Sequence, residues 1–207
     1  MTTTRVHHFV LYAVSPVFFI VLCLCGTAAG QSGSTSNESY FPLAVGNWWA
    51  YTVRGQSGNT LRTIKWRVTQ RELLHGSAVF HLWEQPAQDD EPLSLSSVEA
   101  GIVEADTERF LLKNPLRPGD RWSTKSRSLR APNKVDAFEV ISSGKACSAG
   151  ERSFDDCTIV REVDEANNIA SLTTYARGVG PIKYVYFKSL HSEQVLTTLT
   201  IKSWEVH

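Results

Sequence analysis

The stretch PIKYVYFKSLHSEQVLTTLTIKSW, residues 181–204, shows the pattern that decides the fold. Ile182, Tyr184 and Tyr186 occupy alternate positions in its first half, and residues 195–204 alternate in the same way. Successive side chains of a strand point to opposite faces of its sheet, so alternation with a period of two is typical of half-buried strands. The stretch therefore predicts two neighbouring strands.

The same signal recurs throughout the chain. Runs rich in β-branched and aromatic residues, separated by turn residues, predict strands at 48–53, 60–70, 78–83, 94–103, 109–112, 135–141, 157–163 and 169–177. The best helical pattern, 93–105, is broken by Gly101. We therefore expect an all-β protein with little helix, in which consecutive hairpins build one large antiparallel sheet curled into a barrel or half-barrel.

The first thirty residues have the three zones of a secretory signal. Residues 1–8 carry Arg5 and no acid, 9–24 are almost wholly apolar, and 26–30 are small. Cleavage is expected after Ala29 or Gly30. As an uncleaved membrane anchor the apolar run is short of the ~20 residues that span a bilayer.

A lipoprotein is the other alternative, since Cys23 and Cys25 lie near the end of the apolar run. A leucine precedes each cysteine, where lipid attachment normally needs a small residue, so a lipid-anchored form is disfavoured. The expected organisation is a signal peptide at 1–30, a flexible lead-in at 31–39 with a formal glycosylation sequon at Asn37, and a single β-domain at 40–207. The expected location is secreted or periplasmic.

Composition excludes some classes of partner. The whole chain has 21 basic and 21 acidic residues, and the signal removes only Arg5 from this balance. A near-neutral domain argues against a nucleic-acid binder held by a basic face. No later stretch is long and apolar enough to span a membrane.

Signal removal leaves two of the four cysteines, Cys147 and Cys157. Two cysteines in an exported domain most often pair, so we expect a disulfide that closes a small loop between two strands. A redox or nucleophilic thiol is the alternative, but no Cys-x-x-Cys is present.

One short pattern occurs twice. Residues 42–49, PLAVGNWW, recur as residues 115–122, PLRPGDRW, with the shared form Pro-Leu-x-x-Gly-Asn/Asp-x-Trp. Glycine supplies a backbone turn, Asn or Asp caps it, and Trp begins the next strand as a core residue. The repeat is consistent with two similar half-domains, but poorly matching flanks favour one turn used twice.

Together with GVGPIK at 178–183, these motifs resemble those of uncharacterised exported bacterial proteins, which carry the same two Pro-Leu motifs and a late Gly-x-Gly-x-x-Lys. The stretch from Gly150 to Cys157 is similar to their Ala-Gly-x-Phe-x-x-Cys element, with two extra residues. The resemblance implies an envelope or secreted β-domain akin to lipoprotein-carrier half-barrels. It brings no catalytic residues.

No catalytic constellation is evident. The chain has no Gly-x-Ser-x-Gly elbow, phosphate-binding loop or His-Glu-x-x-His motif. His75, His81, His191 and His207 are not spaced as metal ligands, and the acidic groups match no calcium loop. We therefore expect no cofactor and no metal, and favour binding over catalysis.

Aromatic residues are the candidate ligand contacts, namely Trp49, Tyr51 and Trp122. Packing in the core is the alternative role for each. The leading hypothesis is a non-enzymatic exported domain that binds an apolar, lipid-like ligand or an envelope partner on a curled sheet. The alternative is a glycan-binding module or carbohydrate-active enzyme. A closed apolar cavity would favour the first, and a solvent-facing aromatic row flanked by Asn and Asp the second.

Overall fold

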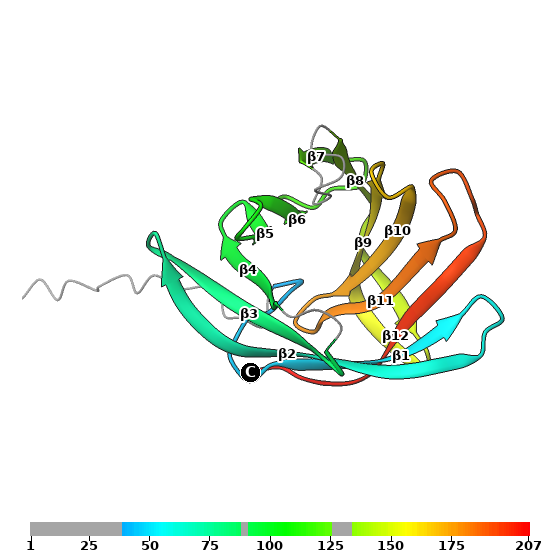
Figure 1. The fold of residues 1–207 in the computed structure, drawn as a ribbon, viewed down its shortest axis with the longest axis horizontal. Coiled ribbons are helices and arrows are strands. Elements are labelled where there is room, and N and C mark those ends of the chain that lie inside the picture. Colours follow the sequence, from blue (N-terminus) through cyan, green and yellow to red (C-terminus); the bar gives the residue numbers. More distant parts are fainter. Residues whose placement is uncertain (1–38, 88–90, 126–133) are drawn as a thin grey trace, which may run out of the picture. The chain divides into compact units, whose positions relative to one another are not determined.

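The computed structural model describes residues 39–87, 91–125 and 134–207. All regular secondary structure in these ranges is β-strand, as Figure 1 shows. The strands are β1 Trp48–Gly55, β2 Thr60–Leu74, β3 Ser77–Gln85, β4 Leu93–Val98, β5 Gly101–Glu104, β6 Arg109–Lys113, β7 Arg121–Lys125, β8 Val135–Ala149, β9 Arg152–Asp164, β10 Ile169–Ala176, β11 Gly180–Phe187 and β12 Val195–Glu205. The predicted signal, its cleavage site at Ala29 or Gly30, and Asn37 lie outside the described residues.

The twelve strands form one antiparallel sheet that curls into a nearly closed barrel, so the predicted fold class is confirmed. Its order is β6-β5-β4-β3-β2-β1-β12-β11-β10-β9-β8-β7. Strands that follow one another in sequence pair, except β6 and β7, and β1 also pairs with β12 in the middle of the sheet. The edge strands are therefore β6 and β7, which follow one another along the chain.

Two boundaries differ from the prediction. The run expected at 94–103 is two strands, β4 and β5, because Gly101 has a φ of 140°, which other residues rarely adopt. A Cβ there would also lie 1.9 Å from the carbonyl oxygen of Leu112. Strands β8 and β9 extend beyond 135–141 and 157–163 into a long hairpin that turns at Gly150. The extension is largely polar, so it lacks the alternation of apolar and polar residues that predicts a strand.

The repeated motif forms the same turn twice. In the first copy the Gly46 N–H donates to the Val68 carbonyl over 2.9 Å, and the Val68 N–H returns a 2.9 Å bond to the Asn47 carbonyl. Gly46 has a φ of 101°, which explains the need for glycine. The turn thus joins the start of β1 to β2 through these two backbone hydrogen bonds.

In the second copy Gly119 and Asp120 make the same two bonds with Val140 of β8, at 2.8 and 2.9 Å. The Asp120 carboxylate also accepts the Arg117 N–H at 3.0 Å, as expected of a capping residue. One turn thus opens each run of six strands, β1–β6 and β7–β12.

The segment that precedes β1 packs into one end of the sheet. Tyr40, Phe41 and Leu43 are buried, and the Phe41 ring meets Trp49 edge-on at a centroid distance of 5.5 Å. The Ser39 carbonyl accepts the N–H of Gly178 in the β10–β11 loop at 2.9 Å. These contacts fill the end of the barrel at which β1 begins.

The two edges meet through a buried arginine. Arg109 of β6 is 4% exposed, and its guanidinium donates to Glu104 of β5 and Asp136 of β8, each over 3.0 Å, and to Glu162 of β9. Nearby, the Trp122 indole N–H of β7 donates to a β6 carbonyl at 2.9 Å. Because the carboxylates come from both sides of the seam, Arg109 ties one edge of the sheet to the other.

Replacing Arg109 should therefore weaken the link between the two edges of the sheet. Arg109→Met leaves buried carboxylates without their cation, so we expect a loss of about 3–5 kcal/mol in the free energy of unfolding. Arg121→Met is the matched control, since Arg121 is 73% exposed on the other edge strand and pairs only with Glu139 among the described residues. Surface pairs contribute about 0–1 kcal/mol. Equal losses in urea unfolding of the two variants would contradict the assignment.

Glu162 gives the seam a pH dependence. Burial raises the pKa of Glu162, Asp136 and Asp164 raise it further, and Arg109 lowers it without cancelling the rise. Between the usual glutamate pKa and the raised one, the folded protein therefore holds a proton that the unfolded chain has released. Stability is then complete below the usual glutamate pKa and declines as pH rises through the raised value.

We accordingly expect the free energy of unfolding of Glu162→Gln to be at least as large as that of wild type at neutral pH. The difference between the two free energies should shrink as pH falls. Urea unfolding across a pH series measures this, and Glu151→Gln in the exposed β8–β9 turn controls for the loss of an acidic charge. A Glu162→Gln protein less stable than wild type at neutral pH would refute the raised pKa.

Candidate functional site

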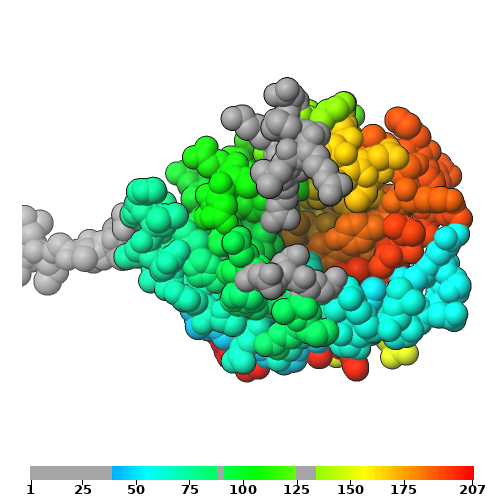
Figure 2. Space-filling model, viewed as in Figure 1, coloured from blue at the N-terminus to red at the C-terminus, as the bar shows by residue number. Residues whose placement is uncertain are grey.

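An apolar cavity opens at the end of the barrel opposite the buried N-terminal segment. It lies among the tips of the β1–β2, β9–β10 and β11–β12 hairpins, and we call it the hairpin mouth. Figure 1 shows the β1–β2 and β11–β12 hairpins as neighbouring cyan and orange-red arms, and Figure 2 shows their surfaces on the same side of the molecule. Its volume is about 390 Å³, within the usual range for small-molecule sites.

Strand alternation builds the floor of this cavity. Trp66 of β2 and Tyr186 of β11 line it, and Tyr51 and Tyr184 are buried beside them. The Trp66 ring lies 5.2 Å from both the Tyr51 and the Tyr184 centroids, and Tyr184 stacks on Tyr186 at 6.4 Å. Offset and edge-on contacts of this kind fix the rings, so the floor is preformed.

Aliphatic side chains complete the wall and rim. Ile64 and Leu199 are buried in the wall, whereas Ile169 and Leu196 stand at the rim with 37% and 48% exposure. Polar groups also reach the cavity from Arg62, Glu84, Asn167, Asn168 and Lys188. The arrangement, apolar inside and polar at the opening, suits a ligand with one apolar part.

Trp49 and Tyr51, two of the residues predicted to contact a ligand, lie in the core of β1. Both are 0% exposed. The Tyr51 hydroxyl donates to the Pro181 carbonyl at 2.7 Å, and the Trp49 indole N–H donates to the Val179 carbonyl. A ligand could touch neither ring without displacing these neighbours, which favours the alternative role of core packing.

Trp122, the third predicted contact, lies on edge strand β7, far in sheet order from β1. It is 8% exposed, and its ring stacks on Phe138 at 5.2 Å with an interplanar angle of 1°. A shallow cavity of about 470 Å³ adjoins this pair, flanked by Arg121 and Arg161. The structure therefore does not bring Trp122 together with Trp49 and Tyr51.

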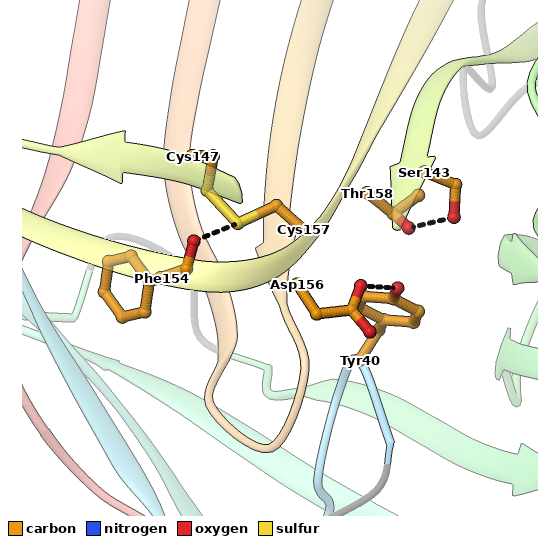
Figure 3. Close-up of a disulfide and its surroundings, with 7 residues drawn as sticks. All are labelled: Tyr40, Ser143, Cys147, Phe154, Asp156, Cys157 and Thr158. Carbon is orange, nitrogen blue, oxygen red and sulfur yellow. Dashed lines mark hydrogen bonds between the residues drawn. A yellow bond between two sulfur atoms is a disulfide. The ribbon is translucent and has the colours of Figure 1, made fainter. Parts of the chain in front are cut away.

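The structure joins Cys147 of β8 to Cys157 of β9, with 6.0 Å between their Cα atoms (Figure 3). The bond lies in the long β8–β9 hairpin, whose outer part packs against β12. There Phe154 contacts Trp204 at 5.7 Å, and Arg152 lies 4.6 Å from the same ring. The sulfurs are thus part of a structural hairpin and do not reach the hairpin mouth.

A polar cluster lies near the disulfide, at the filled end of the barrel. Tyr40 donates to Asp156, as Figure 3 shows, and Arg177 donates to the other oxygen of that carboxylate. Slight burial acts to raise the pKa of Asp156, but the bonds from Tyr40 and Arg177 outweigh it and hold the pKa low. Tyr40 and Arg177 also line a cavity of about 510 Å³. The guanidinium of Arg177 is already paired with Asp156. This cavity is therefore a weaker candidate for a ligand site.

The two tyrosines buried beside the hairpin mouth are not suited to acid–base chemistry. Burial raises the pKa of Tyr51 and of Tyr184 well above the usual value for tyrosine, so both phenols stay protonated. Across residues 39–87, 91–125 and 134–207, no three His, Cys, Asp or Glu side chains gather as metal ligands, and no helix could cross a membrane.

Trp66 and Tyr186 line the hairpin mouth but are not among the predicted ligand contacts, although both lie in predicted strands. Periodicity groups Ile64 with Trp66 and Tyr184 with Tyr186 on shared faces, but it does not say which face is inside the barrel or which end stays open. The turn residues at 164–168, between the predicted strands 157–163 and 169–177, are the available sign that Asn167 and Asn168 stand at one end of the sheet.

Comparison with known proteins gives a limited result. No protein-family model matches the chain, and no curated protein matches it. Among solved structures, a Bacteroides fragilis protein described as exported, with a YmcC-like fold, is 10% identical at a TM-score of 0.45, covering 80% of this chain and 98% of its own. A Parabacteroides distasonis protein described as a lipoprotein is 11% identical at 0.43, with the same coverage. At these values the similarity carries no conclusion about function.

Proposed function

We propose that this protein is an exported, non-enzymatic β-domain that binds a small apolar ligand in the hairpin mouth. The observation that carries the proposal is the 390 Å³ cavity with Trp66 and Tyr186 at its floor. Aromatic rings offer a ligand large apolar surfaces that lose little conformational freedom on binding. Small-molecule sites are typically concave and mostly apolar, with a few polar groups that set orientation.

Binding is favoured over catalysis by the chemistry of the cavity. The charged residues that line it are Arg62, Glu84 and Lys188, and no described nucleophile lies beside a general base there. The aromatic and aliphatic lining therefore supports retention of a ligand, and gives no means of transforming it.

The carbohydrate-binding alternative would use an exposed aromatic face. Trp122 is the candidate, but one face of its ring is stacked on Phe138 and its exposure is 8%. Sugar platforms present an open ring face, so we favour the apolar ligand.

Export rests on the first thirty residues of the sequence. Mass spectrometry of the protein from the secreted or periplasmic fraction should find a mature start near Gly30 or Gln31, without an acyl group. A mature start at Cys23 or Cys25 with added lipid would replace the free form by an anchored one.

Ligand binding is tested with the neutral apolar dye N-phenyl-1-naphthylamine, whose fluorescence rises on transfer from water. We expect uptake by the mature domain, and a weakening of about tenfold or more for Trp66→Ala, which removes the floor. Thr197→Phe fills the cavity from β12 without removing a core ring and should block uptake. Trp48→Ala, which is outside the cavity, is the matched control.

Equal uptake by all four proteins would place the dye elsewhere and overturn the assignment of the cavity. Binding of soluble oligosaccharides without uptake of the dye would favour the carbohydrate alternative.

A further inference from the structure

The hairpin mouth carries an uneven distribution of charge. Three charged residues line it, and two of them, Arg62 and Lys188, are cations against the single carboxylate of Glu84. Arg62 is the third residue of β2, and Lys188 directly follows β11. Because β1 and β12 lie between those strands in the sheet, the two cations approach the opening from opposite sides.

The carboxylate is already engaged inside the cavity. Glu84 accepts the Trp66 indole N–H at 3.1 Å, and its side chain is 24% exposed. The nearest nitrogen of Arg62 is 4.0 Å from Glu84, at the edge of an ion pair, while 46% of the Arg62 side chain is exposed. Glu84 is the only acidic partner of Arg62 among the described residues, so its guanidinium can donate to a further acceptor.

Lys188 is exposed at the rim and makes no ion pair within the described part of the chain. Its backbone N–H closes the β11–β12 hairpin by donating to the Gln194 carbonyl at 2.9 Å, so the residue is anchored while its ammonium group is not. Asn168 adds an amide donor at the same opening, whereas the side-chain amide of Asn167 already donates to Asp164 at 2.7 Å.

We propose that the hairpin mouth selects single-chain amphiphiles with an anionic head group, a proposal that rests on the apolar-ligand function above. The chain lies on Trp66 and Tyr186, and the head group sits between Arg62 and Lys188. Arginine presents a planar fork of donors that matches carboxylate and phosphate oxygens, and lysine adds a mobile point charge. A volume of about 390 Å³ is near the lower limit for ligand sites, which suits one chain rather than two.

Carboxylate and phosphate heads share this chemistry, so the test includes both. Isothermal titration of the mature domain would compare dodecanoate, dodecyl phosphate, neutral dodecyl maltoside and cationic dodecyltrimethylammonium, each kept below its micellar concentration. At low ionic strength we expect one or both anions to bind about tenfold more tightly than the cation, a gap that salt should narrow. The tighter anion identifies the head group as carboxylate or phosphate.

The variants test the two cations directly. Lys188→Gln and Arg62→Gln should each reduce the ratio of anion affinity to neutral-amphiphile affinity severalfold. Lys202→Gln removes an exposed lysine of β12 that is outside the cavity and should leave the ratio unchanged. Near-ultraviolet circular dichroism confirms that each variant stays folded.

The outcomes separate the two proposals. Similar affinity for all four head groups, or an anion preference unaffected by both variants, would overturn the head-group proposal while leaving the apolar site in place. Failure to bind any of the four amphiphiles would overturn the apolar site itself.

Discussion

The buried guanidinium of Arg109 is the interaction on which the rest of the structure depends. An open twelve-stranded sheet ends in two exposed edges, and exposed edges are sites of unwanted pairing. Here the edges belong to β6 and β7, and Arg109 spans the gap to Glu104, Asp136 and Glu162. Burying a guanidinium is costly unless carboxylates surround it, so the charge is tolerated only when the sheet has curled far enough to bring β6 to β8 and β9.

Closure gives the sheet an interior face, and the two sides of this interior differ in polarity. The seam side holds the charges around Arg109, whereas the side built from β1, β2, β11 and β12 holds the aromatic cluster of Tyr51, Trp66 and Tyr184. At one end Tyr40 and Phe41 fill the space. At the other, three hairpins surround the cavity. The proposed binding site therefore lies where the barrel is apolar, preformed and open.

Much of this fold was predictable from alternation alone. The pattern at Ile182, Tyr184 and Tyr186 predicts a strand with these side chains on one face, and the repeated Pro-Leu motifs mark two strand starts that the structure forms with the same turn. Closure was not predictable, because Arg109 lies five, 27 and 53 residues from its partners and no periodicity links them. Trp49 and Tyr51 were predicted as ligand contacts because aromatic side chains that line a curled sheet can hold an apolar chain. Only the covering segment at Tyr40 and Phe41, and the bonds to the β10–β11 loop, show that β1 begins in the core.

In the proposed complex, a ligand's apolar chain enters the barrel at the hairpin mouth. The most direct measurement is an isotope-filtered NMR experiment on the mature domain with dodecanoate. We expect intermolecular Overhauser contacts between the chain methylenes and the ring protons of Trp66 and Tyr186, with none to Trp122. Contacts to Trp122 instead, or none to any residue of the cavity at a concentration where dodecanoate is bound, would contradict it.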